Sequence, residues 1–151
     1  MVQLFNNFTS DIESDELIMF YSSNIEETYL NQDTIYSFKA KDIDNYSDFL
    51  ISNKFKLHKP PVLRVQAIDN TVKVNSNTHT HTTNWNYILF LNDNFDGGEL
   101  IIENITVKPL KNQLVMFSGN APHKVLPVTN GIRYTLVVFS DDKGKFISNV
   151  I

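Results

Sequence analysis

Three histidines in two short segments have the residue types and spacing of a metal site. His79 and His81 lie in the polar run at residues 77–83, and His123 lies in Ala121-Pro122-His123. Imidazole nitrogens bind divalent iron and similar metals, and this cysteine-free chain offers no thiolate to compete with them. We therefore predict that His79, His81 and His123 bind one metal ion, if the fold brings their segments together.

Arg133 adds a group that can bind an acid beside this metal. Asn130-Gly131 stands between His123 and Arg133 and is a typical hairpin signal. A hairpin there would place Arg133 on the strand next to His123 and deeper in the fold, with Thr135 on the same strand face. A guanidinium can bind a carboxylate through two parallel hydrogen bonds. These residues predict a metal with an anionic co-substrate held next to it.

Length and composition limit the class of protein. The chain has 151 residues, no cysteine and a formal net charge of −4, which predicts a single domain over residues 1–151 and excludes disulfide frameworks and iron–sulfur clusters. An acidic balance argues against nucleic-acid binding, which requires clustered Lys and Arg. We see no signal peptide and no apolar run of about 18 residues, so we expect a cytoplasmic protein without a membrane span.

Hydrophobic patterns predict a mainly β fold. In the N-terminal third they indicate strands at Leu17–Tyr21 and Thr34–Phe38 and a short amphipathic helix over residues 42–51. The strands predicted after Pro61 are Val62–Ile68, Thr71–Asn75, Asn77–Thr82, Asn86–Leu91, Glu99–Ile102, Ile105–Pro109, Gln113–Phe117, His123–Val128 and Arg133–Ser140.

Many short strands without helices between them are typical of a jelly roll. We predict a double-stranded β-helix core over residues 61–141 that carries the metal site. Residues 1–60 would form a supporting layer with a short helix and extra strands. Gly97-Gly98 is interpreted as a turn without a chemical role, and Trp85 as a packing residue.

Several segments between Val62 and Ser140, taken in order, resemble the iron(II)- and 2-oxoglutarate-dependent oxygenases, and are most similar to their small prolyl-4-hydroxylase-like branch. The segments are Tyr87 to Asn92, Gly97 to Leu100, Leu114 to Phe117, His123-Lys124-Val125, Pro127-Val128-Thr129 and Gly131 to Leu136. The ten-residue spacing from histidine to arginine is the most specific part of the resemblance.

The resemblance implies a jelly-roll oxygenase that uses iron(II), O2 and 2-oxoglutarate to hydroxylate a substrate that the sequence does not identify. The family's distal iron histidine falls on His123, its 2-oxoglutarate-binding basic residue on Arg133, and an assisting hydroxyl on Thr135. A prolyl peptide is the family's default substrate, although a small molecule is also compatible with the sequence.

The chain departs from the family pattern at two positions. The proximal motif is normally His-x-Asp or His-x-Glu, so either His81 takes the carboxylate position after His79, or Thr83 takes it after His81. We prefer the first register, which gives a three-histidine site. The tyrosine that precedes Leu-Asn in the family, and helps to bind 2-oxoglutarate there, is Phe90 in this chain.

These departures leave two other classes of function open. One is a three-histidine metal dioxygenase that does not use 2-oxoglutarate, in which Arg133 would bind a carboxylate of the substrate itself. The other is a non-catalytic jelly-roll binding module.

Overall fold

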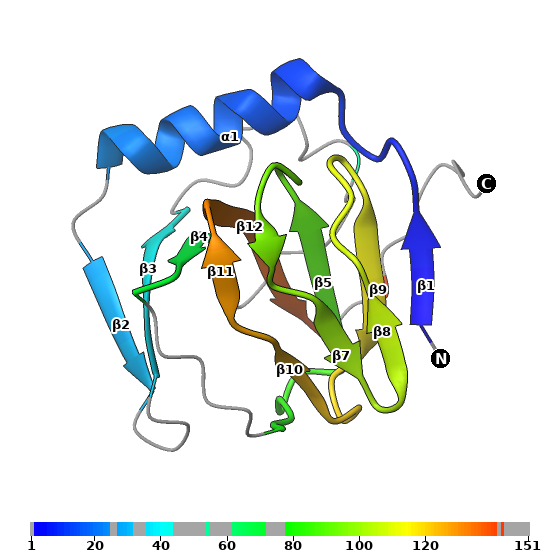
Figure 1. Cartoon of the computed structure of the whole chain (residues 1–151). Coiled ribbons are helices and arrows are strands. Elements are labelled where there is room, and N and C mark those ends of the chain that lie inside the picture. Colours follow the sequence, from blue (N-terminus) through cyan, green and yellow to red (C-terminus); the bar gives the residue numbers. More distant parts are fainter. Residues whose placement is uncertain are drawn as a thin grey trace.

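The computed structural model describes residues 2–24, 27–31, 36–43, 54, 62–71, 78–141 and 143. One helix and twelve strands lie in this part of the chain (Figure 1). In chain order they are β1 (Val2–Phe5), α1 (Asp11–Asn24), β2 (Glu27–Asn31), β3 (Tyr36–Asp42), β4 (Val62–Asp69), β5 (Trp85–Phe90), β6 (Asp96–Gly97), β7 (Leu100–Ile102), β8 (Ile105–Val107), β9 (Leu114–Ser118), β10 (His123–Val125), β11 (Val128–Asn130) and β12 (Ile132–Ser140).

The strands form one large and two small antiparallel sheets. The seven-stranded sheet has the order β1-β9-β5-β12-β4-β3-β2, and the smaller sheets have the orders β10-β7-β8 and β11-β6. The mainly β fold predicted from the sequence is therefore confirmed. Helix α1 spans the molecule from the β2–β3 side to the β1 side (Figure 1).

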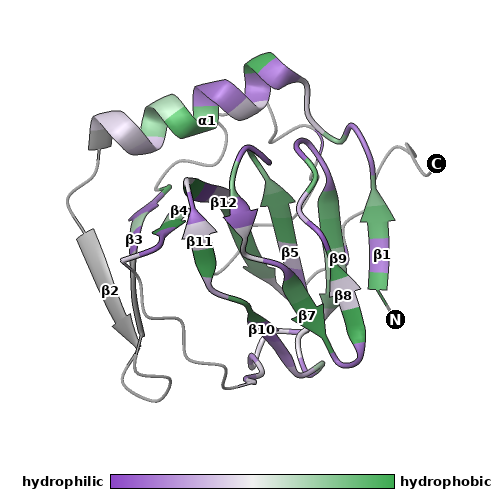
Figure 2. Cartoon of the chain, viewed as in Figure 1, coloured by the Kyte–Doolittle hydropathy of each residue, from purple (hydrophilic) through white to green (hydrophobic). Residues whose placement is uncertain are grey.

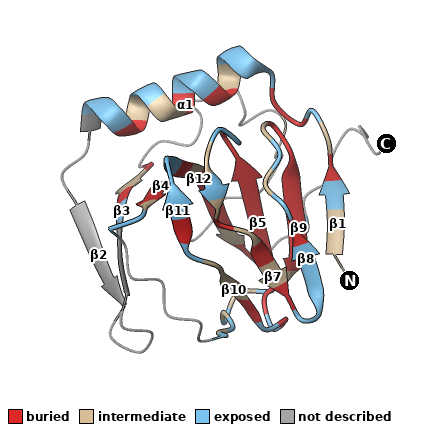
Figure 3. Cartoon of the chain, viewed as in Figure 1, coloured by how far each residue is buried: buried red, intermediate tan, exposed pale blue. Residues whose placement is uncertain are grey.

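Side chains of the large sheet supply two cores, one on each face. On strand β5, Tyr87 and Leu89 pack with Leu17 and Tyr21 of α1, whereas Ile88 packs with residues of the small sheets. Strands covered on both faces become apolar along their length. Figures 2 and 3 show this for β5 and β9, which are mostly hydrophobic and mostly buried. The inner core, between the sheets, contains the candidate site.

The prediction of a strand at Leu17–Tyr21 is wrong, because these residues lie in α1. Ser10 and Glu13 form a capping box at the start of the helix: the Ser10 N–H donates to Glu13 Oε1 at 2.9 Å, and the Glu13 N–H donates to Ser10 Oγ at 3.2 Å. This arrangement stabilises a helix start. The helix was not recognised from its hydrophobic pattern, because the apolar residues Ile12 and Met19 are exposed and interrupt the helical spacing of the buried ones.

The hairpin predicted at Asn130-Gly131 is also wrong. Strand β12 pairs with β4 and β5, and the predicted strand His123–Val128 is split into β10 and β11, which belong to different sheets. Pro127 interrupts this segment because proline has no N–H for a ladder. Gly131, at φ 80°, then turns the chain from the small sheets into the large one. Arg133 is therefore on the sheet facing His123, not on the strand beside it.

Other predictions differ from the structure in smaller ways. The predicted strand at residues 77–82 is, in its described part, a single bridge between His79 and His123, and the strand at Thr34–Phe38 corresponds to the start of β3. Strands β1 and β2 were not predicted. The helix over residues 42–51 and the strand Thr71–Asn75 lie mostly outside the described residues. No helix in the described part of the chain is both long and apolar enough to cross a membrane.

Asn112 connects α1 to the large sheet. Its buried side chain accepts hydrogen bonds from Thr9 and Ser14 and donates to Asp11 Oδ1 at 2.7 Å. Its backbone N–H donates to Phe90 O at 2.8 Å. The residue has φ 70°, a conformation that asparagine tolerates better than most residues.

We expect Asn112→Ala to lower the free energy of unfolding by about 2–4 kcal/mol, because it removes the amide that the Thr9 and Ser14 hydroxyls share as an acceptor and strains the backbone. Urea unfolding followed by circular dichroism measures the change. Asn104→Ala, at an exposed turn position, is the control and should stay within about 0.5 kcal/mol of the parent. A loss below about 1 kcal/mol at Asn112 would contradict this role.

Candidate functional site

The structure brings the three predicted histidines together. His79 and His123 face each other across a bridge in which each backbone N–H donates to the other's carbonyl, at 3.0 and 3.1 Å. The His81 N–H donates to Gly119 O at 2.8 Å, and this bond fixes the backbone two residues after His79. One ring nitrogen from each of the three histidines lies within 4.8 Å of the others.

The nitrogen spacing suits a metal ion. His81 Nε2 and His123 Nε2 are 3.2 Å apart, and two nitrogens bound at right angles to one metal at about 2.1 Å are separated by about 3 Å. His123 Nδ1 lies 2.9 Å from Ala121 O. A carbonyl can only accept, so Nδ1 carries the proton and Nε2 keeps its lone pair for a metal.

The protein keeps two of these rings neutral. Burial lowers the pKa of His81 to about 3, and the neighbouring histidines add to this effect. Burial also lowers the pKa of His123 to about 4, although its hydrogen bond to Ala121 opposes the shift. Neutral imidazole is the form that binds metal, so His81 and His123 have available lone pairs at pH 7.

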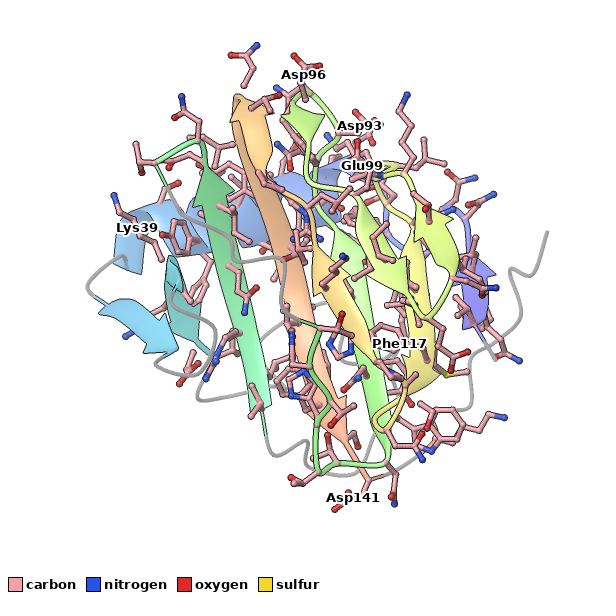
Figure 4. The ribbon with its side chains drawn as sticks, turned by 60° about the horizontal axis from the view of Figure 1, so that its bottom comes forward. Lys39, Asp93, Asp96, Glu99, Phe117 and Asp141 are labelled. Carbon is pink, nitrogen blue, oxygen red and sulfur yellow. The ribbon has the colours of Figure 1, made fainter. Side chains whose placement is uncertain are left out.

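Two phenylalanine rings of the large sheet pack against the histidines. The Phe139 ring lies 4.2 Å from the His81 ring, and the Phe117 ring lies 4.9 Å from the His123 ring, measured between centroids. Figure 4 shows Phe117 toward the end of the molecule where Asp141 lies, and Glu99 toward the opposite end. The histidine cluster is therefore at the Asp141 end of the fold.

Arg133 lies toward the Glu99 end. Its side chain is 1% exposed, its Nε donates to Gly98 O at 2.9 Å, and its Cζ lies 5.3 Å from the centre of the Phe90 ring. Burial lowers the pKa of Arg133 to about 10, while attraction from Glu99 opposes the shift. The guanidinium therefore remains charged at pH 7.

Two buried polar atoms at this end have no hydrogen-bond partner among the described residues. They are Arg133 Nη2 and Thr135 Oγ1. Arg133 and Thr135 alternate with Tyr134 on β12, so the predicted shared strand face is confirmed by the unbroken register of β12 against β4. Both groups can donate to a carboxylate, and buried donors normally have partners.

Sequence reasoning missed two residues that position Arg133. Gly98, at φ 71°, supplies the carbonyl that accepts from Arg133, and a Cβ there would lie 2.8 Å from Arg133 Cδ. Asn92 donates to Ile132 O at 2.7 Å and accepts from the Tyr134 N–H at 2.9 Å, which holds the backbone on both sides of Arg133. In the sequence, Gly97-Gly98 was interpreted only as a turn, and Leu91-Asn92 only as the end of a strand.

A comparison with protein families identifies the class. Residues 62–141 match the 2OG-Fe(II) oxygenase superfamily, and this match covers more than half of the chain. The chain therefore belongs to the 2OG-Fe(II) oxygenase superfamily. The family implies iron(II) as the cofactor and 2-oxoglutarate as a co-substrate.

Curated relatives resemble part of the chain. A PKHD-type hydroxylase of Pseudomonas putida (strain W619) is 46% identical over 52 residues, which cover 30% of this chain and 23% of that protein. The PKHD-type hydroxylase PiuC of Pseudomonas aeruginosa is 39% identical over 74 residues, covering 44% of this chain and 33% of that protein. The match thus spans a third or less of these relatives' lengths.

Solved structures confirm the jelly-roll oxygenase fold. A Pseudomonas putida prolyl-4-hydroxylase superposes with a TM-score of 0.67 at 16% identity, covering 94% of this chain and 93% of that one. A viral collagen prolyl hydroxylase from Paramecium bursaria Chlorella virus-1, solved as a 2-oxoglutarate complex, gives a TM-score of 0.64 at 15% identity and covers 91% of this chain and 93% of that one.

Gly98→Ala should weaken 2-oxoglutarate binding by at least about tenfold, because the new methyl group occupies the space of Arg133 Cδ. Titration calorimetry on anaerobic Fe(II)-loaded protein measures this. Gly131→Ala is a matched control: its φ of 80° is equally unfavourable for alanine, but its Cβ would meet Asn94 and Phe95, not Arg133. Equal 2-oxoglutarate affinity in both variants would show that Gly98 does not position Arg133.

Proposed function

We propose that this chain is an iron(II)- and 2-oxoglutarate-dependent oxygenase that hydroxylates an as yet unidentified substrate. One observation carries the proposal: Arg133 is a fully buried, charged guanidinium with an unpartnered Nη2, in the same inner core as three converging histidines. A metal and a carboxylate would satisfy both groups at once.

We assign the metal to His79, His81 and His123. Their converging ring nitrogens support the register in which His81 takes the position of the usual carboxylate. Thr83 is the alternative residue for that position. A set of three neutral imidazoles fits iron(II) and carries one negative charge less than the usual ligand set.

We assign the far carboxylate of 2-oxoglutarate to Arg133 and Thr135. Inward side chains of β12 and β5 between this end and the histidines are apolar, notably Val137 and its cross-strand partner Ile88. We call these inward side chains the apolar strip. It has polar groups at both ends, which suits a short-chain diacid. Phe90 supports the Arg133 guanidinium through a cation–π contact and has no hydroxyl of its own, so Arg133 and Thr135 bind without a tyrosine.

Iron(II) with 2-oxoglutarate and O2 supplies the oxidation when bound. The chain's own residues would bind and orient the reactants: the histidines would hold the metal, Arg133 would fix the direction of the acid, and the Phe117 and Phe139 rings pack against His123 and His81. Positioning and electrostatics are the usual contribution of a protein to cofactor chemistry.

We propose a peptide as the substrate class, with prolyl hydroxylation as the default. This is supported by a Trichoplax adhaerens prolyl hydroxylase, solved with a hypoxia inducible factor peptide fragment, which superposes with a TM-score of 0.67 at 17% identity and covers 93% of this chain and 83% of that one. A cytoplasmic location stays a prediction from the cysteine-free composition.

A second candidate function is a three-histidine dioxygenase that does not use 2-oxoglutarate. His81 and Phe90 favour it, because both replace residues that the oxygenase family uses. In that case Arg133 binds a carboxylate of the substrate. Succinate release coupled to turnover separates the two functions.

His123→Ala should abolish binding of one Fe(II) per chain, because it removes a buried neutral ligand. Anaerobic titration of tag-free protein, with bound metal measured by mass spectrometry, provides the test. His58→Ala is the control and should keep full occupancy. His79→Ala should also abolish binding. If His79→Ala is nearly silent and Thr83→Asp strengthens binding, the register that starts at His81 is correct and our assignment is wrong.

Arg133→Ala should weaken 2-oxoglutarate binding by at least about tenfold and leave Fe(II) binding unchanged, because the arginine would bind the acid and is not a metal ligand. Arg133→Lys should restore part of the affinity, since lysine keeps the charge without the planar fork. Calorimetry and oxygen-dependent succinate formation give the readouts. Unchanged affinity in Arg133→Ala, or no 2-oxoglutarate binding to the parent, would favour the three-histidine dioxygenase or a non-catalytic module.

A further inference from the structure

Asn86 is a buried polar residue that the predicted site does not use. Its side chain is 0% exposed, and neither Nδ2 nor Oδ1 has a hydrogen-bond partner among the described residues. A buried amide without partners costs free energy, and such groups are rare enough in folded proteins to need an explanation.

The position of Asn86 in β5 directs it toward the histidine cluster. Side chains alternate along a strand, so Asn86 shares the inward face with Ile88 and Phe90. Its partners across the ladder are Phe117 on β9 and Phe139 on β12.

Both of these neighbours contact the cluster. The Phe117 ring packs on His123, and the Phe139 ring packs on His81. Residues directly opposite in an antiparallel pair lie on one face of the sheet. The Asn86 amide therefore lies between the two rings that support the candidate metal ligands, at the end of the inner strip away from Arg133.

The chemistry of the cluster explains why an amide is useful there. The two phenyl rings offer no donor to the oxygen atoms of a metal-bound acid, and His123 Nδ1 already donates to Ala121 O. Asn86 offers two donor hydrogens and one acceptor beside the Phe117 and Phe139 rings. Arg133 and Thr135 cannot serve this end, because they lie six and four residues before Phe139 on β12.

We propose that the Asn86 amide hydrogen-bonds to the metal-bound end of the 2-oxo acid, and so defines the near end of the acid site as Arg133 defines the far end. This inference rests on the proposed function. It makes Asn86 a ligand-contacting residue, with its free amide retained for binding and not for folding.

The test uses two acids of different length with anaerobic Fe(II)-loaded protein and titration calorimetry. Oxalate can chelate the metal but is too short to reach Arg133 as well, whereas 2-oxoglutarate reaches both ends. Asn86→Ala should weaken both acids by about tenfold, with Fe(II) affinity unchanged. Arg133→Ala should weaken 2-oxoglutarate only.

Asn112→Ala is the matched control, since Asn112 is a buried asparagine whose amide is fully engaged by protein groups. The metal-free proteins should show opposite patterns in urea. Asn112→Ala should lower the unfolding midpoint and retain acid affinity, whereas Asn86→Ala should keep its midpoint and lose acid affinity. Asn86→Leu, which fills the space with an apolar side chain, should behave like Asn86→Ala toward both acids.

Each result has one reading. Oxalate and 2-oxoglutarate affinities within twofold of the parent in both Asn86 variants would overturn the proposal, as would a fall in unfolding midpoint as large as that of Asn112→Ala. A parent protein that binds Fe(II) and oxalate but not 2-oxoglutarate would contradict the proposed function, while the loss of oxalate binding in Asn86→Ala would still support a contact at the metal end. A parent that binds no Fe(II) would contradict both.

Discussion

The buried charge of Arg133 is the main constraint on the candidate site. Arg133 cannot lose its proton near neutral pH even though burial lowers its pKa to about 10, and a buried charge is costly unless it is paired. The surrounding residues reduce this cost in part. Gly98 accepts from Nε, the Phe90 ring faces the guanidinium, and Asn92 holds the backbone on both sides. Nη2 has no hydrogen-bond partner among the described residues, and we propose that a carboxylate of the acid binds there.

The histidine cluster follows a complementary rule. Burial and mutual proximity keep His81 and His123 neutral, and the Ala121 carbonyl selects the tautomer of His123. In the proposed function, the histidine cluster is the metal end of one apolar strip and the charged arginine is its carboxylate end. Both ends are held by the large sheet, because β12 carries Arg133 and Thr135 while Phe139 of the same strand packs on His81.

The sequence predicted the β-rich core better than the arrangement of its strands. Short apolar runs between turn signals located β4, β5, β9 and β12 to within a residue or two, and His79, His81 and His123 were singled out as candidate metal ligands because imidazole is a recognisable ligand type. The Asn130-Gly131 signal misled because local turn chemistry does not specify which sheet the chain enters next. Leu17–Tyr21 was misread because a short apolar run fits helix and strand equally, and the Ser10–Glu13 capping box was overlooked. Gly98, Asn92 and Asn86 could not be assigned roles from the sequence, because the residues that each contacts or faces across the sheet are distant in the chain.

The most direct test of this account is a crystal structure of the protein with Fe(II) and 2-oxoglutarate, prepared without oxygen. We expect one metal ion bound by ring nitrogens of His79, His81 and His123, with the far carboxylate of the acid on Arg133 Nη2 and Thr135 Oγ1. A metal bound elsewhere, or an acid whose carboxylate does not meet Arg133, would contradict it.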